Sequence, residues 1–139
     1  MTTTSTNENS TFDWPIRIYY EDTDAGGIVY HSNYLKYFER ARTELLRAKG
    51  VSQQLLLEQQ LGFVVKHMDI DFLQGAQLDQ ELTVKTHVSQ LKRVSLDFCQ
   101  EIVNLDGKVL CRAVVRVACI NTSKMKPTAI PNFIISEFS

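Results

Sequence analysis

The sequence predicts a single α+β domain in which one antiparallel sheet covers one long helix. Apolar residues recur with a helical period over residues 34–48, and with the two-residue period of strands in several later segments. No other predicted element is large enough to bury the apolar stripe of this helix, so the sheet must cover it. At 139 residues the chain suits one domain, which we place at residues 12–139 behind a disordered polar tail, residues 1–11.

The first strand and the turn after it are predicted from residue type. Residues 14–20 are aromatic and β-branched, which favours a strand. The pair Gly26-Gly27 ends this region, because glycine tolerates the backbone angles of a sharp turn. The long helix follows, and its apolar residues are spaced three or four apart: Tyr34, Phe38, Ala41, Leu45 and Ala48.

Polar residues and a glycine mark the ends of the long helix. Ser32 or Asn33 is expected to cap its start, and Gly50 is expected to end it. A second, shorter helix is expected over residues 52–60. Three arginines are expected on the solvent or interface side of the long helix: Arg40, Arg42 and Arg47.

Alternating apolar and polar residues predict four further strands. They cover residues 62–73, 82–88, 94–102 and 109–120, with a hairpin turn at residues 104–107. In the first of them the even positions form the apolar face: Val64, Met68, Ile70 and Phe72. In the last, Val114, Ala118 and Ile120 make the second face largely apolar too, which predicts either a central strand or a strand with one face against a partner subunit.

Composition argues against several classes of protein. The net charge of −1 does not favour a nucleic-acid partner, and no apolar stretch approaches the ~18 residues needed to span a membrane. The signature motifs of zinc proteases, P-loop proteins and dinucleotide-binding proteins do not occur, and no metal site is expected. The cysteines lie in apolar runs without a Cys-x-x-Cys pair. We therefore interpret Cys99, Cys111 and Cys119 as core residues of a protein from the reducing cytosol.

Titratable residues crowd the segment between the first strand and the long helix. Asp22 and Asp24 precede the glycine turn, and spacing alone does not rank one aspartate over the other. His31 lies at or just before the first turn of the helix, where backbone N–H groups lack intrahelical partners and the helix dipole is positive. A carboxylate delivered there can attack, or direct water at, a carbonyl that those N–H groups polarise. Tyr20 is either a core aromatic residue or a hydroxyl donor to a substrate.

This segment and the start of the helix resemble a known family. Residues 20–34 read Tyr-Glu-Asp-Thr-Asp-Ala-Gly-Gly-Ile-Val-Tyr-His-Ser-Asn-Tyr, and residues 38–44 read Phe-Glu-Arg-Ala-Arg-Thr-Glu. Both are similar to the 4-hydroxybenzoyl-CoA thioesterase branch of the hotdog superfamily. Within that branch the chain most resembles the acyl-CoA thioesterases of bacterial Tol–Pal gene clusters, and the similarity runs from about residue 14 to the C-terminus.

The resemblance implies a hotdog fold, a dimer with active sites at the subunit interface, and two dimers in a homotetramer. It also implies hydrolysis of acyl thioesters of coenzyme A or of acyl-carrier protein. Coenzyme A is then part of the substrate, and no separate cofactor is expected. The catalytic aspartate of the family matches Asp24, as nucleophile or as general base, and the N–H that polarises the carbonyl matches His31. Tyr20 matches the tyrosine that accompanies them.

Lys92 and Arg93, in an expected turn between strands, are candidates for binding the phosphates of coenzyme A, although basic residues in turns are commonly just solvated. Two other functions stay open. An acyl-carrier or lipid-enzyme binding adaptor would use the same pocket with little catalysis. A hotdog dehydratase would need Glu39 or Glu44 as the carboxylate on its helix.

Overall fold

The computed structural model describes residues 11–138. The tail predicted to be disordered, residues 1–11, lies outside the described residues except for Thr11, so its disorder stays a prediction. The elements are, in order, β1 (Phe12–Arg17), the 3₁₀ helix η1 (Tyr20–Asp22), α1 (Asn33–Ala48), α2 (Gln53–Glu58), β2 (Leu61–Phe72), β3 (Glu81–Leu91), β4 (Ser95–Val103), β5 (Val109–Asn121), β6 (Lys126–Pro127) and α3 (Asn132–Phe138).

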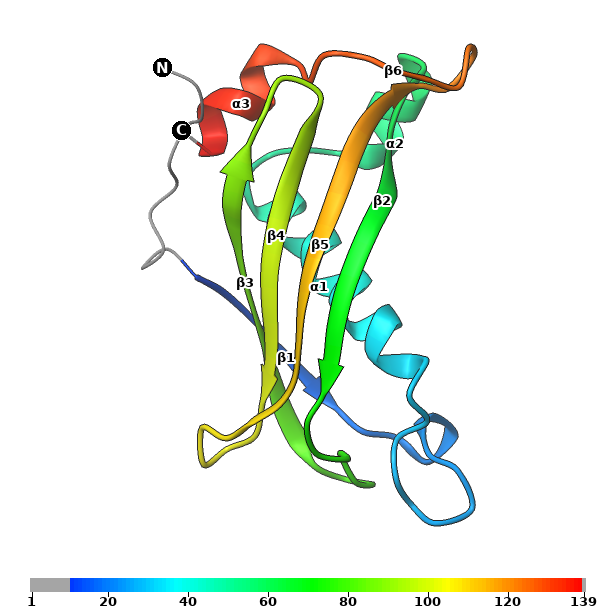
Figure 1. Cartoon of the computed structure of the whole chain (residues 1–139), viewed down its shortest axis with the longest axis vertical. Coiled ribbons are helices and arrows are strands. Elements are labelled where there is room, and N and C mark those ends of the chain that lie inside the picture. The colour runs from blue at the N-terminus through cyan, green and yellow to red at the C-terminus, as the bar shows by residue number, and fades with distance from the viewer. Residues whose placement is uncertain (1–10, 139) are drawn as a thin grey trace.

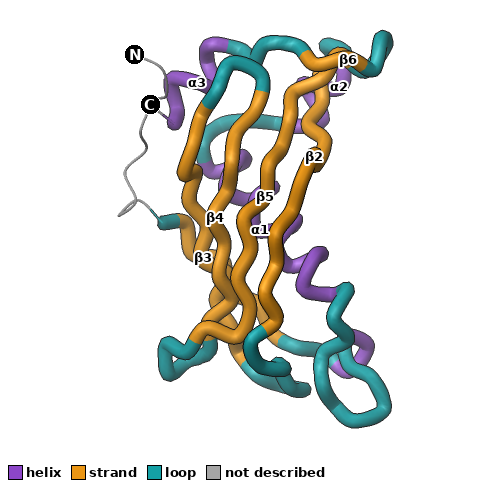
Figure 2. Tube along the Cα trace, in the orientation of Figure 1, coloured by secondary structure: helices purple, strands orange, loops and turns teal. Residues whose placement is uncertain are grey.

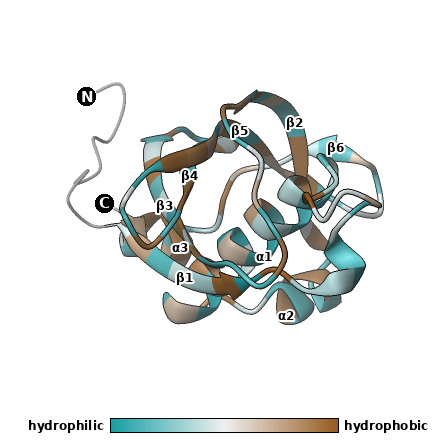
Figure 3. Cartoon of the chain, turned by 90° about the horizontal axis from the view of Figure 1, so that it is seen from below, coloured by the Kyte–Doolittle hydropathy of each residue, from teal (hydrophilic) through white to brown (hydrophobic). Residues whose placement is uncertain are grey.

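One antiparallel sheet curves around α1, as Figures 1 and 3 show from two directions. Its strand order is β1-β3-β4-β5-β2, and the short β6 pairs with β5. The strands run along the length of the molecule, with the helices on one side of them (Figure 2). This arrangement confirms the expected α+β class and the hotdog fold.

The first strand is shorter than predicted. It ends at Arg17, and the chain then enters η1 instead of continuing as strand to residue 20. The cause is local, because the side chain of Asp22 accepts a hydrogen bond from the backbone N–H of Tyr19 at 2.8 Å and draws the chain into a turn.

The long helix buries the predicted stripe except Ala48, and it also buries Arg42, which was expected outside the core. Its buried residues are Tyr34, Tyr37, Phe38, Ala41, Arg42, Leu45 and Leu46. Arg42 is therefore not solvated, the first of the two alternatives expected for it, because its side chain lies against the sheet and donates to Gln100. Ala48 was misplaced. It is exposed together with Arg47 and Lys49, since the last turn of the helix is not covered.

The helix ends follow the prediction at one end only. Gly50 has φ +81°, and Val51 donates back to the carbonyl of Leu46 at 2.9 Å, so glycine ends α1 as expected. Neither candidate cap acts through its side chain on the helix start. Ser32 makes no side-chain cap bond, because its own backbone is already helical (φ −68°, ψ −19°), and the Asn33 amide bonds to a loop instead.

A β-bulge changes the inward face of β2. The register with β5 shifts between Val65 and His67, so that one extra residue enters the strand. Phe63 packs on the core before the bulge, and Met68 and Ile70 pack on it after the bulge. The even-position prediction is thus correct only for the second half of the strand, and Val64 was wrongly assigned inward.

The outer face of the sheet carries many charged side chains, and β5, the strand expected to be apolar on both faces, is central, between β4 and β2. Side chains of alternating sign face one another across all five strands, in the register Asp13, Lys85, Glu101, Arg112 and Asp71. The Nζ of Lys85 lies 3.2 Å from Asp13, and the Nε of Arg112 lies 3.8 Å from Glu101. Of the apolar residues predicted for this face, only Val114 is exposed, while Ala118 and Ile120 are buried within the chain. This face therefore gives little support to an apolar subunit contact.

Candidate active site

The segment between η1 and α1 folds back on itself as a small hairpin. Thr23 and Val29 form an isolated bridge, and the backbone N–H of Asp24 donates to the carbonyl of Ile28 at 2.9 Å. The N–H of Gly27 returns to the carbonyl of Asp24 at 3.0 Å, which closes the tip. Gly27 has φ +75°, a conformation that side chains disfavour, and this explains the glycine at the tip.

Asp24 is held at the tip with its carboxylate exposed. One oxygen, Oδ1, accepts a hydrogen bond from the N–H of Gly26 at 2.9 Å, which orients the carboxylate. The other oxygen accepts no hydrogen bond from the described residues. This carboxylate is thus oriented by its own turn and has one oxygen open to solvent.

Asp22 has a different role, which the spacing did not reveal. Its carboxylate is engaged by the Tyr19 N–H, as described above. Its backbone oxygen accepts from the N–H of Tyr30 at 3.1 Å and from the side-chain amide of Asn33 at 2.8 Å. Asp22 therefore anchors the loop to the start of α1, and Asp24 is the aspartate that the loop presents.

The start of α1 leaves two N–H groups unpaired. The N–H groups of Asn33, Tyr34 and Leu35 donate to carbonyls three residues earlier, at 2.9, 3.3 and 3.2 Å. Within residues 11–138, no hydrogen bond uses the N–H of His31 or Ser32. The free donors expected at the helix start thus lie at these two residues, beside the hairpin that carries Asp24.

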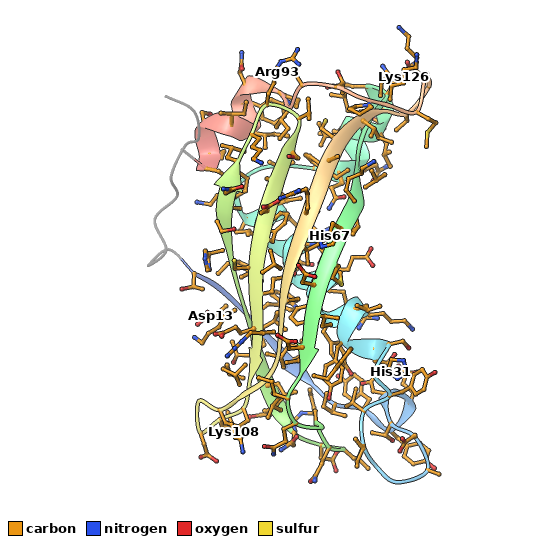
Figure 4. The ribbon with its side chains drawn as sticks, viewed as in Figure 1. Asp13, His31, His67, Arg93, Lys108 and Lys126 are labelled. Atoms are coloured by element: carbon orange, nitrogen blue, oxygen red, sulfur yellow. The ribbon has the colours of Figure 1, made fainter. Side chains whose placement is uncertain are left out.

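The His31 ring packs among aromatic side chains at the foot of α1 (Figure 4). Its centroid lies 4.6 Å from that of Tyr30 and 6.1 Å from that of Phe72, which it meets edge-on. Phe72 also lies 5.6 Å from Tyr34 and is 49% exposed. Sequence reasoning missed Phe72, because only the fold brings the end of β2 to the start of the helix.

Two tyrosines of α1, Tyr34 and Tyr37, have their hydroxyl groups inside the protein near this site. The hydroxyl of Tyr34 accepts from the N–H of Ala76 at 2.9 Å, and burial raises the pKa of Tyr34. The Tyr37 hydroxyl is buried and has no hydrogen-bond partner in the described structure. Burial, and next the nearby carboxylate of Asp22, raises the pKa of Tyr37. Both hydroxyls are therefore protonated at neutral pH and are not bases.

The remaining predicted site residues are dispersed. Tyr20 lies in η1, at the same end as Asp24, with its side chain 82% exposed. Arg93 lies at the opposite end of the molecule from His31 (Figure 4), in the turn between β3 and β4 that also holds Lys92. One chain alone does not bring Lys92 and Arg93 to the hairpin, so their role in binding phosphates stays a prediction.

Among residues 11–138, no three acidic, histidine or cysteine side chains are grouped so that they can hold a metal ion. None of the helices in this part of the chain has the length and apolar character that crossing a bilayer requires.

Comparison with known proteins identifies the family. The sequence model of the thioesterase-like superfamily matches residues 19–138 of this chain. The chain belongs to this superfamily. It is 46% identical over 127 residues to the acyl-CoA thioester hydrolase YbgC of Escherichia coli O6:H1, with 91% of this chain and 95% of that protein covered. It is 50% identical over 128 residues to the acyl-CoA thioesterase YbgC of Haemophilus influenzae, with 91% and 93% covered.

A solved structure supports the same assignment. A probable thioesterase from Bartonella henselae superposes with a TM-score of 0.82 at 40% identity, covering 88% of this chain and 100% of that one. The expected membership of a thioesterase family is therefore confirmed, and the chain is an enzyme of the thioester hydrolase class.

Proposed function

We propose that this protein hydrolyses acyl-CoA thioesters to a free acid and coenzyme A. Membership of the thioesterase-like superfamily and the names of the relatives support this substrate class. The local observations that carry the proposal are the exposed carboxylate of Asp24 on a hairpin bonded to the start of α1, and the unpaired N–H groups of His31 and Ser32 at that start. Coenzyme A enters as part of the substrate, and no further cofactor is required.

In the proposed reaction the thioester carbonyl lies against the start of α1 and accepts from the N–H of His31. Asp24 either attacks the carbonyl carbon and expels the thiolate of coenzyme A, giving a mixed anhydride that water then hydrolyses to the free acid and Asp24. Or it takes a proton from a water that attacks the carbonyl carbon, and the tetrahedral intermediate expels the same thiolate to leave the free acid. Both routes need an ionised carboxylate close to a polarised carbonyl. Tyr20 is assigned the part of a hydroxyl donor near the same substrate.

The proposed assembly is a dimer with active sites at its interface, with two dimers forming a tetramer. It is supported by β2, a long edge strand that pairs only with β5 among the described strands. If a second subunit pairs antiparallel with this edge, its β3–β4 turn comes to the same end of the assembly as the hairpin of the first subunit. Lys92 and Arg93 are proposed to meet the phosphates of coenzyme A in that assembly. The unpaired cysteines at 99, 111 and 119 favour a cytoplasmic location.

Release of free thiol from a panel of acyl-CoA and acyl-carrier-protein thioesters tests the function. We expect turnover by the wild type and a loss of ~10²–10⁴ in kcat for Asp24→Asn, which keeps the shape and removes the charge. Glu21→Gln removes an exposed charge three residues earlier and is the matched control, with an unchanged rate. Equal rates for Asp24→Asn and wild type would contradict the assignment of Asp24. No turnover of any thioester by a folded protein would favour the binding adaptor.

A further inference from the structure

The hydroxyl of Tyr37 is a buried donor that the proposed reaction does not use. Tyr37 lies in the first half of α1, and only 2% of it is exposed. Among the side chains of residues 11–138, its hydroxyl is the one buried polar group without a hydrogen-bond partner. Buried polar groups in folded proteins are almost always paired, because an unpaired one has lost its bonds to water and gained none. This exception therefore points to a partner that the hydroxyl bonds in another state of the protein.

The carboxylate of Asp22 lies beside this hydroxyl. Asn33 and Tyr37 are one turn apart on the same side of α1, and the side-chain amide of Asn33 donates to the backbone oxygen of Asp22 at 2.8 Å. After burial, the charge of the Asp22 carboxylate is the largest cause of the raised pKa of Tyr37. Two independent observations thus place the two groups together.

One oxygen of the Asp22 carboxylate is free to accept a further hydrogen bond. Its Oδ2 accepts from the N–H of Tyr19 at 2.8 Å, and its Oδ1 accepts no hydrogen bond from the part of the chain that the structure describes. None of the ion pairs among residues 11–138 includes Asp22. A free donor and a free acceptor therefore lie next to each other where the loop meets the helix, and a small movement of the loop would join them.

The movement that joins the two groups also moves Asp24. Asp22 lies two residues before Asp24, and Thr23 between them begins the hairpin through its bridge to Val29. A bond between the Asp22 carboxylate and Tyr37 would therefore fix the direction in which the chain enters the hairpin. The position of the carboxylate that the hairpin presents would be fixed with it.

We propose that Tyr37 is a positioning residue of the thioester hydrolysis, whose hydroxyl donates to the Asp22 carboxylate when an acyl-CoA occupies the site. This bond sets the position of Asp24 at the start of α1, and the inference rests on the proposed function. Because the bond forms only in the occupied enzyme, it stabilises the reacting complex without stabilising the free protein. Tyr37 acts through Asp22 and needs no contact with the substrate.

Tyr34 provides the comparison within the same helix. Its ring meets that of Tyr37 edge-on, with the centroids 6.2 Å apart, and its hydroxyl accepts from the N–H of Ala76 at 2.9 Å. The Tyr34 hydroxyl is thus paired in the free protein, whereas the Tyr37 hydroxyl is not. Removing the first should weaken the fold, and removing the second should not.

Tyr37→Phe, which removes only the hydroxyl oxygen, is tested by thermal unfolding and by thiol release from the acyl-CoA that the wild type hydrolyses fastest. The thermal midpoint should stay unchanged or rise, because no bond is lost and a buried unpaired group is removed. The kcat should fall about fivefold to tenfold, the effect of one hydrogen bond made only in the reacting complex, with KM within about twofold. Tyr34→Phe is the matched control and should lower the midpoint. A merely structural role for Tyr37 would lower midpoint and kcat together.

A double-mutant cycle with Asp22→Ala tests whether Tyr37 acts through Asp22. In that background Tyr37→Phe should change kcat by less than about twofold, since the acceptor is already absent. The bond from Tyr19 is lost in both members of this pair, so its loss does not affect the comparison.

Amide hydrogen exchange tests the same bond without turnover. Asp24→Asn loaded with the same acyl-CoA should exchange the N–H groups of residues 22–30 more slowly than the unloaded variant, because the bond ties the hairpin to α1. Adding Tyr37→Phe should remove at least about half of this protection.

Four results would each overturn the proposal: a wild-type kcat for Tyr37→Phe, a joint fall of its midpoint and kcat, an equal loss of kcat in the Asp22→Ala background, or full protection in the loaded double variant. Absence of thiol release by the wild type from every thioester would instead refute the proposed function, and this inference with it.

Discussion

The side-chain amide of Asn33, the first residue of α1, donates to the backbone oxygen of Asp22 at 2.8 Å. This bond links the start of α1, where the unpaired N–H groups lie, with the loop that carries Asp24. The N–H of Tyr30 reaches the same oxygen, so two donors hold the base of the hairpin. The position of the Asp24 carboxylate relative to the helix start therefore depends on bonds made by the neighbouring residues Asp22, Tyr30 and Asn33.

Asn33→Ala should lower the free energy of unfolding by about 1 kcal/mol, the typical value for one hydrogen bond. It should reduce thioester turnover by a larger factor than this loss of stability explains, because the hairpin loses one of its two anchors. Urea unfolding and thiol release measure the two effects. Ser32→Ala is the matched control, since the Ser32 side chain makes no cap bond. Indistinguishable turnover of the two variants would show that the Asn33 bond does not position the loop.

Gly75→Ala should displace the hairpin that carries Asp24, because Gly75 lies against Ile28 of that hairpin. A Cβ at this position would lie 2.9 Å from the Cγ2 of Ile28, closer than side chains tolerate. Turnover should fall, while the thermal midpoint changes by only a few degrees, because the strained contact lies in surface loops. Adding Ile28→Ala removes the clashing methyl group and should restore activity. A double variant as impaired as Gly75→Ala alone would show that this contact is not the cause.

Gln100→Leu should destabilise the fold by about 2–4 kcal/mol, because it leaves the buried guanidinium of Arg42 without its acceptor. Urea unfolding of the variant measures the loss. The same substitution at Gln90, an exposed residue of β3, is the control and should stay within about 0.5 kcal/mol of wild type. A loss of similar size at both positions would indicate that the buried network contributes little.

Stability should fall in alkaline solution between about pH 9 and pH 12. Burial, together with the nearby Asp71 carboxylate, raises the pKa of Cys111 from its ordinary value of 9.0 to about 12. The folded state then holds a proton that the unfolded state has released, so the free energy of unfolding declines as pH rises through this window. Burial raises the pKa of Cys119 and of Tyr34 as well, which adds to the same trend.

Cys111→Ala tests this origin, since it removes one of the titrating groups. The variant is expected to be less stable at neutral pH because of the cavity, but its stability should depend less steeply on pH above 9. Chemical unfolding at a series of pH values gives both slopes. Parallel slopes for the two proteins would assign the alkaline loss to other groups.

Short-range patterns predicted much of this molecule. The period of α1, its end at Gly50 and the hairpin turn before Gly107 (φ +82°) depend on residues close together in the chain, and all three are confirmed. The motif around Asp24 likewise predicted a turn that delivers a carboxylate to a helix start. Its similarity to known thioesterases predicted the family, which the comparisons confirm.

Only the tertiary structure decided the features that depend on distant partners. The sequence by itself determined the approximate positions of the long helix, the main strands and the glycine turn after Asp24, because backbone preferences and periodicity act over a few residues. It did not determine that Asp22 anchors the hairpin, that Phe72 meets His31, or that a bulge reverses the faces of β2. Nor did it reveal that Arg42 turns inward, because its acceptor, Gln100, lies 58 residues away. Each of these depends on which surfaces meet when the sheet closes around α1.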